Sequence, residues 1–230
     1  MAEIFFPSCK VSAGFPAESR RIRRYLEERR GVSTWGCCRS SHGGLTAKDS
    51  VVVVCNNCAG ITEEASAAES LIYAWEIIDR DPTFPFPDYG GEAMTVQDCW
   101  AAAERRSMQE AIRSLLRKMN VTVVEQEENY DKTRYHGTAL LVPCVPSNAE
   151  LMPRRYEGGH SPLFTPMSEA QQRVHLKKYT DKITTEKVVC TCKFCRDGIN
   201  LGGKTGVHII ELLFPDDDST NTRPDKEATA

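Results

Sequence analysis

Cysteines are grouped along this chain, and each group follows a short apolar segment. The 230 residues include ten cysteines, arranged as a vicinal pair, a Cys-x-Cys pair and two Cys-x-x-Cys pairs. Their positions are Cys9, Cys37, Cys38, Cys55, Cys58, Cys99, Cys144, Cys190, Cys192 and Cys195. In a reducing compartment, thiols grouped in this way serve metal or redox chemistry rather than disulfide bonds. The pattern therefore predicts a chain that folds around a thiolate site.

Charge and hydropathy exclude several classes of protein. The net charge of −3 leaves no basic excess for binding the phosphates of a nucleic acid. No apolar run reaches the roughly 18 residues of a membrane helix. The first residues lack the basic segment and long apolar run of a secretory signal, which predicts a cytoplasmic protein. With 40% hydrophobic residues, a chain of this length can bury a core without disulfides.

The predicted elements follow the same order twice. β-Branched runs predict strands, and apolar residues three and four apart predict helices. In the first half these are strand 3–6, helix 17–30, strand 32–35, strand 50–54 and helix 61–79. In the second half they are strand 93–96, helix 108–119, strand 121–124, helix 168–180, strand 187–189 and a strand or strand-to-helix segment over 207–213. We therefore predict an α/β fold of two pseudo-repeated halves, each with a small, mainly parallel sheet flanked by helices.

The halves have predicted boundaries. Residues 1–80 form the first half and residues 93–215 the second, joined by a Pro- and Gly-rich linker over 81–92. Within the second half, the proline-rich residues 143–167 predict a long irregular loop, which we expect to act as a lid or docking surface. The acidic, polar residues 216–230 predict a disordered tail.

Three kinds of chemistry fit the Cys-x-x-Cys pairs. Cys55 and Cys58 follow a strand and could form a redox dithiol at a helix N-terminus, but this half has more cysteines than a dithiol needs. Together with Cys192 and Cys195 they could instead bind one zinc ion. An iron–sulfur cluster accounts for more of the cysteines, because pairs and distant thiolates converge on such clusters.

The vicinal pair Cys37-Cys38 is the most informative motif. Adjacent residues do not easily occupy two corners of one cubane, and a vicinal disulfide is strained. Two neighbouring thiolates suit an opened cluster, or a sulfur that bridges two irons. With Cys9 before the pair and Cys55-x-x-Cys58 after it, the set resembles the CCG, or cysteine-rich, domain found in the catalytic subunit of heterodisulfide reductase. The resemblance covers about residues 3–214.

That family carries two copies of a Cys…Cys-Cys-Gly…Cys-x-x-Cys motif, which matches the repeat found here. The resemblance implies that a [4Fe–4S] cluster, in a noncubane form, is bound by Cys9, Cys37, Cys38, Cys55 and Cys58. It also implies a redox subunit that receives electrons from a partner iron–sulfur or flavin subunit and passes them to a disulfide or similar acceptor. No dinucleotide-binding fingerprint or ferredoxin-type cysteine run is present, so a partner must supply the electrons.

The chain also departs from the family pattern. Cys38 is followed by Arg39 instead of glycine, and only 16 residues separate it from Cys55, so the cluster could be a conventional cubane. In the second half, Tyr135-His136-Gly137 stands where the family has Cys-Cys-Gly. The second site is then Cys99, Cys192, Cys195 and His136, with Cys190 or Cys144 as substitutes.

Two histidines and two aromatic residues complete the candidate site. His136 and His42 could each serve as a ligand or proton shuttle, or simply form structural hydrogen bonds. Trp35 and Phe194 lie beside ligands in the sequence, and we expect them to shield a cluster from water. Two other functions stay open: a non-catalytic electron relay that binds one cluster, and a zinc–thiolate protein.

Overall fold

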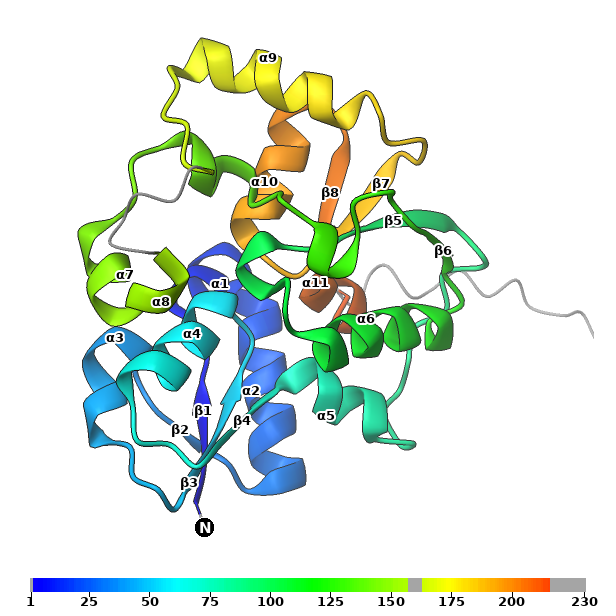
Figure 1. Ribbon diagram of the computed structural model, residues 1–230. Coiled ribbons are helices and arrows are strands. Elements are labelled where there is room, and N and C mark those ends of the chain that lie inside the picture. Colours follow the sequence, from blue (N-terminus) through cyan, green and yellow to red (C-terminus); the bar gives the residue numbers. More distant parts are fainter. Residues whose placement is uncertain (1, 157–162, 216–230) are drawn as a thin grey trace, which may run out of the picture.

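Two four-stranded parallel sheets form the framework of the computed structural model, which describes residues 2–156 and 163–215 (Figure 1). The first sheet has the order β2-β1-β3-β4 and the second the order β6-β5-β7-β8, so the two have the same topology. The strands of the first are β1 (Ala2–Phe6), β2 (Ser33–Thr34), β3 (Asp49–Val53) and β4 (Ser70–Tyr73). Those of the second are β5 (Ala93–Gln97), β6 (Thr122–Val124), β7 (Lys187–Cys190) and β8 (Thr205–His208). The predicted fold class is confirmed.

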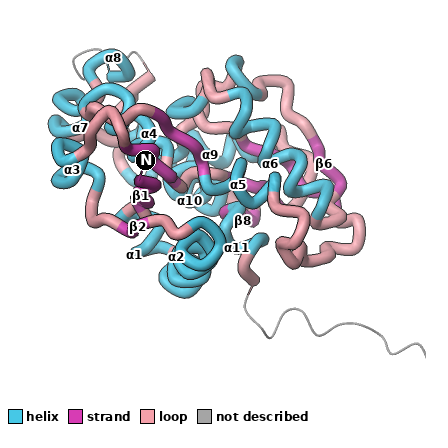
Figure 2. The backbone as a smooth tube through the Cα atoms, turned by 90° about the horizontal axis from the view of Figure 1, so that it is seen from below, coloured by secondary structure: helices cyan, strands magenta, loops and turns pink. Residues whose placement is uncertain are grey.

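Helices cover both faces of the first sheet. On one side lies α2 (Pro16–Arg30), which starts with proline at its first position and ends at Gly31 in a left-handed conformation. On the other side lie α3 (Cys38–Ser41) and α4 (Asn56–Ala65), so the sheet is sandwiched between helices (Figure 2). Coverage of both faces explains why Val51, Val52 and Val53 of the central strand β3 are all buried.

The prediction of one continuous helix over residues 61–79 is wrong. The chain leaves α4 at Ser66, forms strand β4, and only then starts α5 (Ala74–Arg80). The apolar residues between Leu71 and Ile78 fit a buried strand followed by a helix as well as one long helix, and periodicity alone does not separate the two. At the corner, the Glu76 carboxylate accepts the backbone N–H of Tyr73 at 3.1 Å and so starts α5.

The second half repeats this plan. Its amphipathic helix α6 (Arg106–Lys118) packs against α5 of the first half, and α9 (Glu169–Thr180) begins with a capping box of Ser168 and Gln171. Helix α10 (Lys193–Leu201) packs on β7, β8 and α9. Strand β8 leads directly into α11 (Ile209–Leu213), which is the strand-to-helix alternative of the prediction.

Residues 143–167 do not form one irregular loop. Two short helices, α7 (Pro146–Leu151) and α8 (Pro153–Tyr156), lie within this segment. Each begins at a proline, because that residue fits the first turn of a helix even though it disrupts the interior. Residues 157–162 of this segment and the tail predicted to be disordered over 216–230 lie outside the described residues.

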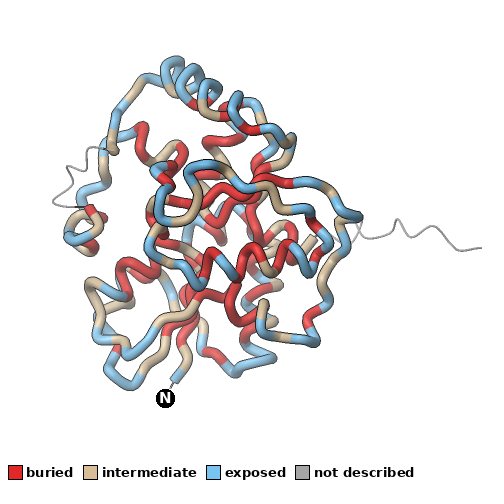
Figure 3. The backbone as a smooth tube through the Cα atoms, turned by 45° about the vertical axis from the view of Figure 1, so that its right-hand side comes forward, coloured by how far each residue is buried: buried red, intermediate tan, exposed pale blue. Residues whose placement is uncertain are grey.

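The two halves share one core. Buried residues of both sheets and of α5, α6 and α11 belong to the same hydrophobic cluster, and the buried backbone is concentrated where the halves meet (Figure 3). Because all strands in each sheet are parallel, the segments that follow β1, β3, β5 and β7 leave the sheets at their carboxyl ends. Cys9, Cys55, Cys99 and Cys192 follow these four strands, and Cys37 and Cys38 follow β2.

Candidate metal centres

Four side chains of the second half converge on one point. Cys99, His136, Cys192 and Cys195 place their ligand atoms within 4.8 Å of one another. The Sγ of Cys99 lies 3.0 Å from Nδ1 of His136, and the Sγ of Cys192 lies 3.8 Å from the same nitrogen. In residues 2–156 and 163–215, no other group of three or more Cys, His, Asp or Glu side chains is gathered this tightly.

This spacing suits a single ion. A tetrahedral zinc site with bonds of 2.0–2.3 Å separates its ligand atoms by about 3.5–3.8 Å, and three cysteines with one histidine are a common structural zinc set. An iron–sulfur cluster instead binds each thiolate to a different iron, which holds the sulfurs further apart. The group is therefore consistent with a metal site for one ion.

Local structure explains how distant residues reach this point. Cys192 is the N-cap of α10 and Cys195 lies in its first turn, while Cys99 is the N-cap of a 3-10 turn, η2 (Trp100–Ala102). His136 precedes a second such turn, η4 (Gly137–Leu141). These positions, at the starts of helical turns, give each ligand a defined backbone conformation.

The centre is enclosed. Cys99, Cys195 and His136 are buried and Cys192 is partly exposed. The His136 ring packs between Trp100 and Phe194, with ring centroids 6.0 and 6.1 Å away. Phe194 thus contacts a residue of this centre, whereas Trp35 packs on Phe6 in the first half.

Gly137 allows the histidine loop to contact the cysteine helix. Its φ is +55°, and a Cβ built there would overlap the carbonyl oxygen of Phe194 and lie 2.7 Å from Cα of Cys195. Only glycine tolerates both the conformation and the contact. The glycine of the Tyr135-His136-Gly137 motif therefore has a structural role of its own.

An ion pair joins the loops that carry Cys99 and His136. Asp98, which precedes Cys99, receives two hydrogen bonds from the buried Arg113 guanidinium, at 2.7 and 3.1 Å. The same carboxylate accepts the backbone N–H of Tyr130 at 2.8 Å, and the Asp98 carbonyl accepts the Thr133 hydroxyl at 3.1 Å. The chain from Tyr130 to His136 is thereby attached to the Cys99 loop.

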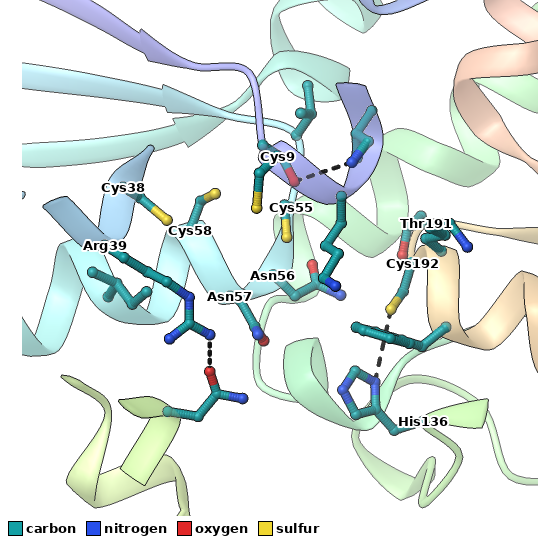
Figure 4. A pocket seen from close by; sticks show the side chains of 18 of the residues that line it. Cys9, Cys38, Arg39, Cys55, Asn56, Asn57, Cys58, His136, Thr191 and Cys192 are labelled. Carbon is teal, nitrogen blue, oxygen red and sulfur yellow. Dashed lines mark hydrogen bonds between the residues drawn. The ribbon is translucent and has the colours of Figure 1, made fainter. Parts of the chain in front are cut away.

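The cysteines of the first half form a second, wider group. Four of them line one cavity of about 120 Å³ between the halves, and Figure 4 shows them on one side with Cys192 and His136 on the other. They are Cys9, Cys38, Cys55 and Cys58. Cys37 does not line the cavity, but its thiol lies beside that of Cys9.

Electrostatics show how closely these thiols interact. The Cys58 thiol donates to Cys55 and is the main cause that lowers the pKa of Cys55 to about 6. The same donor lowers the pKa of Cys38 and, in return, the pKa of Cys58 is raised well above its ordinary value. For Cys9, burial, followed by the charges of Cys37 and Cys55, raises the pKa. Thiols that share protons in this way can lose them to solvent together when a metal binds.

Other predicted site residues lie elsewhere. The Nδ1 of His42 lies 3.0 Å from the backbone oxygen of Cys38, where the ring N–H donates to it, and His42 does not line the cavity. Cys144 is partly exposed and contacts the Val145 carbonyl, while Cys190 is fully buried at the end of β7 with its pKa raised well above the ordinary value by burial. Neither thiol joins the group of four.

Two residues at the centre were not predicted as site residues. Asn56 follows Cys55, is buried and lines the cavity, and Arg113 is buried and binds Asp98, the residue before Cys99. Asn56 lies inside the Cys55-Asn56-Asn57-Cys58 motif, and that position was the signal available for it. Arg113 lies within a helical pattern, and no neighbouring sequence motif marks it as a site residue.

No family model matches this chain, and neither a curated protein nor a solved structure shows significant similarity to it. Among the described residues, no helix has the length and apolar character needed to cross a membrane.

Proposed function

We propose that the protein is an iron–sulfur redox protein that reduces a small disulfide or related acceptor in the cavity between its halves. In this proposal Cys9, Cys37, Cys38, Cys55 and Cys58 bind a [4Fe–4S] cluster, and Cys99, His136, Cys192 and Cys195 bind one zinc ion. The resemblance to the CCG domain of the heterodisulfide reductase catalytic subunit, carried by the first set of cysteines, agrees with this assignment.

The single observation that carries the proposal is the difference between the two groups. One gathers four ligand atoms within 4.8 Å, as a single ion requires, and the other spreads its thiols around a cavity of about 120 Å³. Four thiols around this cavity, with Cys37 beside Cys9, suit several metal atoms rather than one. The donors are all sulfur, which favours iron–sulfur clusters over calcium, magnesium or manganese.

The cavity suits a reaction at sulfur. When bound, the cluster supplies single electrons at this position. Reduction of a disulfide breaks its S–S bond with two electrons and two protons and yields two thiols, and a partner iron–sulfur or flavin subunit is the source of the electrons. The residues of the cavity position the acceptor: Lys10 and Arg39 contribute positive charge, and Phe194 contributes an apolar wall.

A pair of serine variants tests the proposal. Cys38→Ser removes a cavity-lining thiol, whereas Cys144→Ser removes a partly exposed thiol outside both groups. We expect anaerobic protein supplied with dithionite to reduce a small disulfide such as cystine, and expect Cys38→Ser alone to abolish that activity and the absorption near 400 nm. Equal activity and spectra in the wild type and Cys38→Ser would refute the role of Cys38.

A further inference from the structure

The cavity between the halves has a positive lining. Three of its side chains are cationic, Lys10, Arg39 and Lys193, and no aspartate or glutamate among the described residues lines it. The chain as a whole has 32 acidic and 29 basic residues, so this composition is local to the cavity. Lys193 pairs with Asp197, which offsets its charge. Lys10 and Arg39 have no such partner in the part of the chain that the structure describes.

Arg39 is held at this cavity by neutral groups. It is partly buried on α3, and Figure 4 shows its guanidinium on the same side of the cavity as Cys38 and Cys58. The guanidinium donates to the Ser147 hydroxyl and to Oδ1 of Asn148, both in α7. Four other buried or partly buried arginines each pair with a carboxylate instead: Arg105, Arg113, Arg155 and Arg196. The contacts of Arg39 therefore fix its position and leave its charge uncompensated.

The bonds to α7 leave most of this guanidinium available. A guanidinium has five N–H donors, and the two acceptors occupy two of them. The planar donors that remain match the two oxygens of a carboxylate, and such charge-assisted hydrogen bonds are stronger than neutral ones. A cleft lined by charges of one sign also concentrates molecules of the opposite sign. The lining therefore selects an anionic molecule over a neutral or cationic one.

We propose that the acceptor reduced in this cavity carries a carboxylate, which the Arg39 guanidinium binds and the Lys10 ammonium attracts. This inference rests on the proposed function, because it names the chemical class of the acceptor for that reaction. The Phe194 ring, whose centroid lies 5.6 Å from Nζ of Lys10, is the neighbouring apolar surface for the carbon atoms of such an acceptor.

Three small disulfides of different charge test this preference. Dithiodiglycolate carries two carboxylates, bis(2-hydroxyethyl) disulfide is neutral, and cystamine carries two ammonium groups. With dithionite as the source of electrons, each disulfide takes up two electrons and two protons and yields two thiols. We expect kcat/KM of the wild type to be about 10- to 100-fold higher for dithiodiglycolate than for the neutral disulfide, and lowest for cystamine. Equal values for the three disulfides would overturn the inference.

Arg39→Met should lower this preference by about tenfold or more. A change in the cluster alone would alter the rates for all three disulfides by the same factor, so the ratio between disulfides reports the contact with Arg39. Arg173→Met is the matched control, because it makes the same change in net charge at an exposed position of α9 and should keep the ratio. Ser147→Ala removes one anchor of the guanidinium but not its charge, and should also keep it. An unchanged ratio in Arg39→Met, or an equal loss in Ser147→Ala, would refute the role of the Arg39 charge.

Calorimetric titration with thiodiglycolate, a thioether that cannot be reduced, separates this inference from the proposed function. Thiodiglycolate should bind the wild type at least about tenfold more tightly than the neutral thioether thiodiethanol, and Arg39→Met should remove the difference. That result would support the carboxylate site even if no disulfide were reduced. Reduction of all three disulfides with equal kcat/KM would instead leave the proposed function in place and refute the carboxylate site.

Discussion

Replacing Arg113 with methionine should separate the stability of the fold from the affinity of the metal centre. Arg113 has no exposed surface, and its guanidinium binds Asp98 on one side and Glu125 on the other, with Nε 2.6 Å from the Glu125 carboxylate. Methionine retains the aliphatic stem and removes the charge. Asp98 would then remain buried, with the Tyr130 N–H as the remaining donor to its carboxylate.

The magnitude follows from burial. Removing one partner of a buried ion pair costs about 3–5 kcal/mol, because the other charge stays in place without compensation. Glu125, whose side chain is 37% exposed, is solvated by water and adds little to this cost. Because Asp98 also attaches the loop that carries His136, we expect the dissociation constant for zinc to rise about 10- to 100-fold, as is typical of outer-shell changes.

Urea unfolding of the metal-free protein and zinc titration against a chelating dye give the two quantities. Arg106→Met is the control, since Arg106 contacts the Tyr130 ring from 3.6 Å but is 63% exposed and pairs with Glu110 at the surface. It should cost less than about 1 kcal/mol and leave zinc binding unchanged. A destabilised Arg113→Met protein that binds zinc as tightly as the wild type would refute the reasoning that Asp98 positions these ligands.

Three further changes have defined outcomes. Gly137→Ala should destabilise the fold by about 3 kcal/mol or more, measured by urea unfolding, because its Cβ meets the Phe194 carbonyl at positive φ; a cost below about 1 kcal/mol would contradict this contact. His208 is fully buried, and burial lowers its pKa to about 3, so the unfolded chain binds an extra proton between pH 6.5 and 3. Stability should therefore fall by about 1.4 kcal/mol per pH unit as the pH drops through this window; His208→Asn should reduce this slope, and an unchanged slope would assign the effect to other groups. His136→Cys should retain one zinc per chain as a four-cysteine site and His136→Ala should lose it, as measured by metal analysis; equal zinc in both would exclude His136 as a ligand.

The sequence predicts those parts of the structure that depend on local pattern. The strand before Cys55 is predictable from the sequence, because a run of four valines is typical of a parallel strand that is buried on both faces. The equivalence of Cys99 and Cys9 follows from the repeated order of elements, and the two sheets share one topology. The prediction of one helix over residues 61–79 was wrong because the apolar residues there suit a strand and a helix equally.

Other features depend on contacts between distant segments. The role of Arg113 exists only in the folded second half, because its partners Asp98 and Glu125 lie in other elements. The proline-rich segment shows a different limit: Pro146 and Pro153 begin helices, although the number of prolines suggested a loop. His136 is identified only by its place in the repeated motif, because no spacing rule connects it with Cys99.

The proposed function requires two thiolate centres of different kinds in this chain. Cys58 and Cys195 occupy equivalent places in the first turns of α4 and α10, so serine variants of these residues form a matched pair. Iron, zinc and acid-labile sulfide per chain should be measured on protein purified without oxygen. The wild type should contain about four iron, four sulfide and one zinc. Cys58→Ser should lose the iron and sulfide and keep zinc, and Cys195→Ser should do the reverse. Zinc without sulfide in the wild type, or loss of both metals in either variant, would contradict two separate centres.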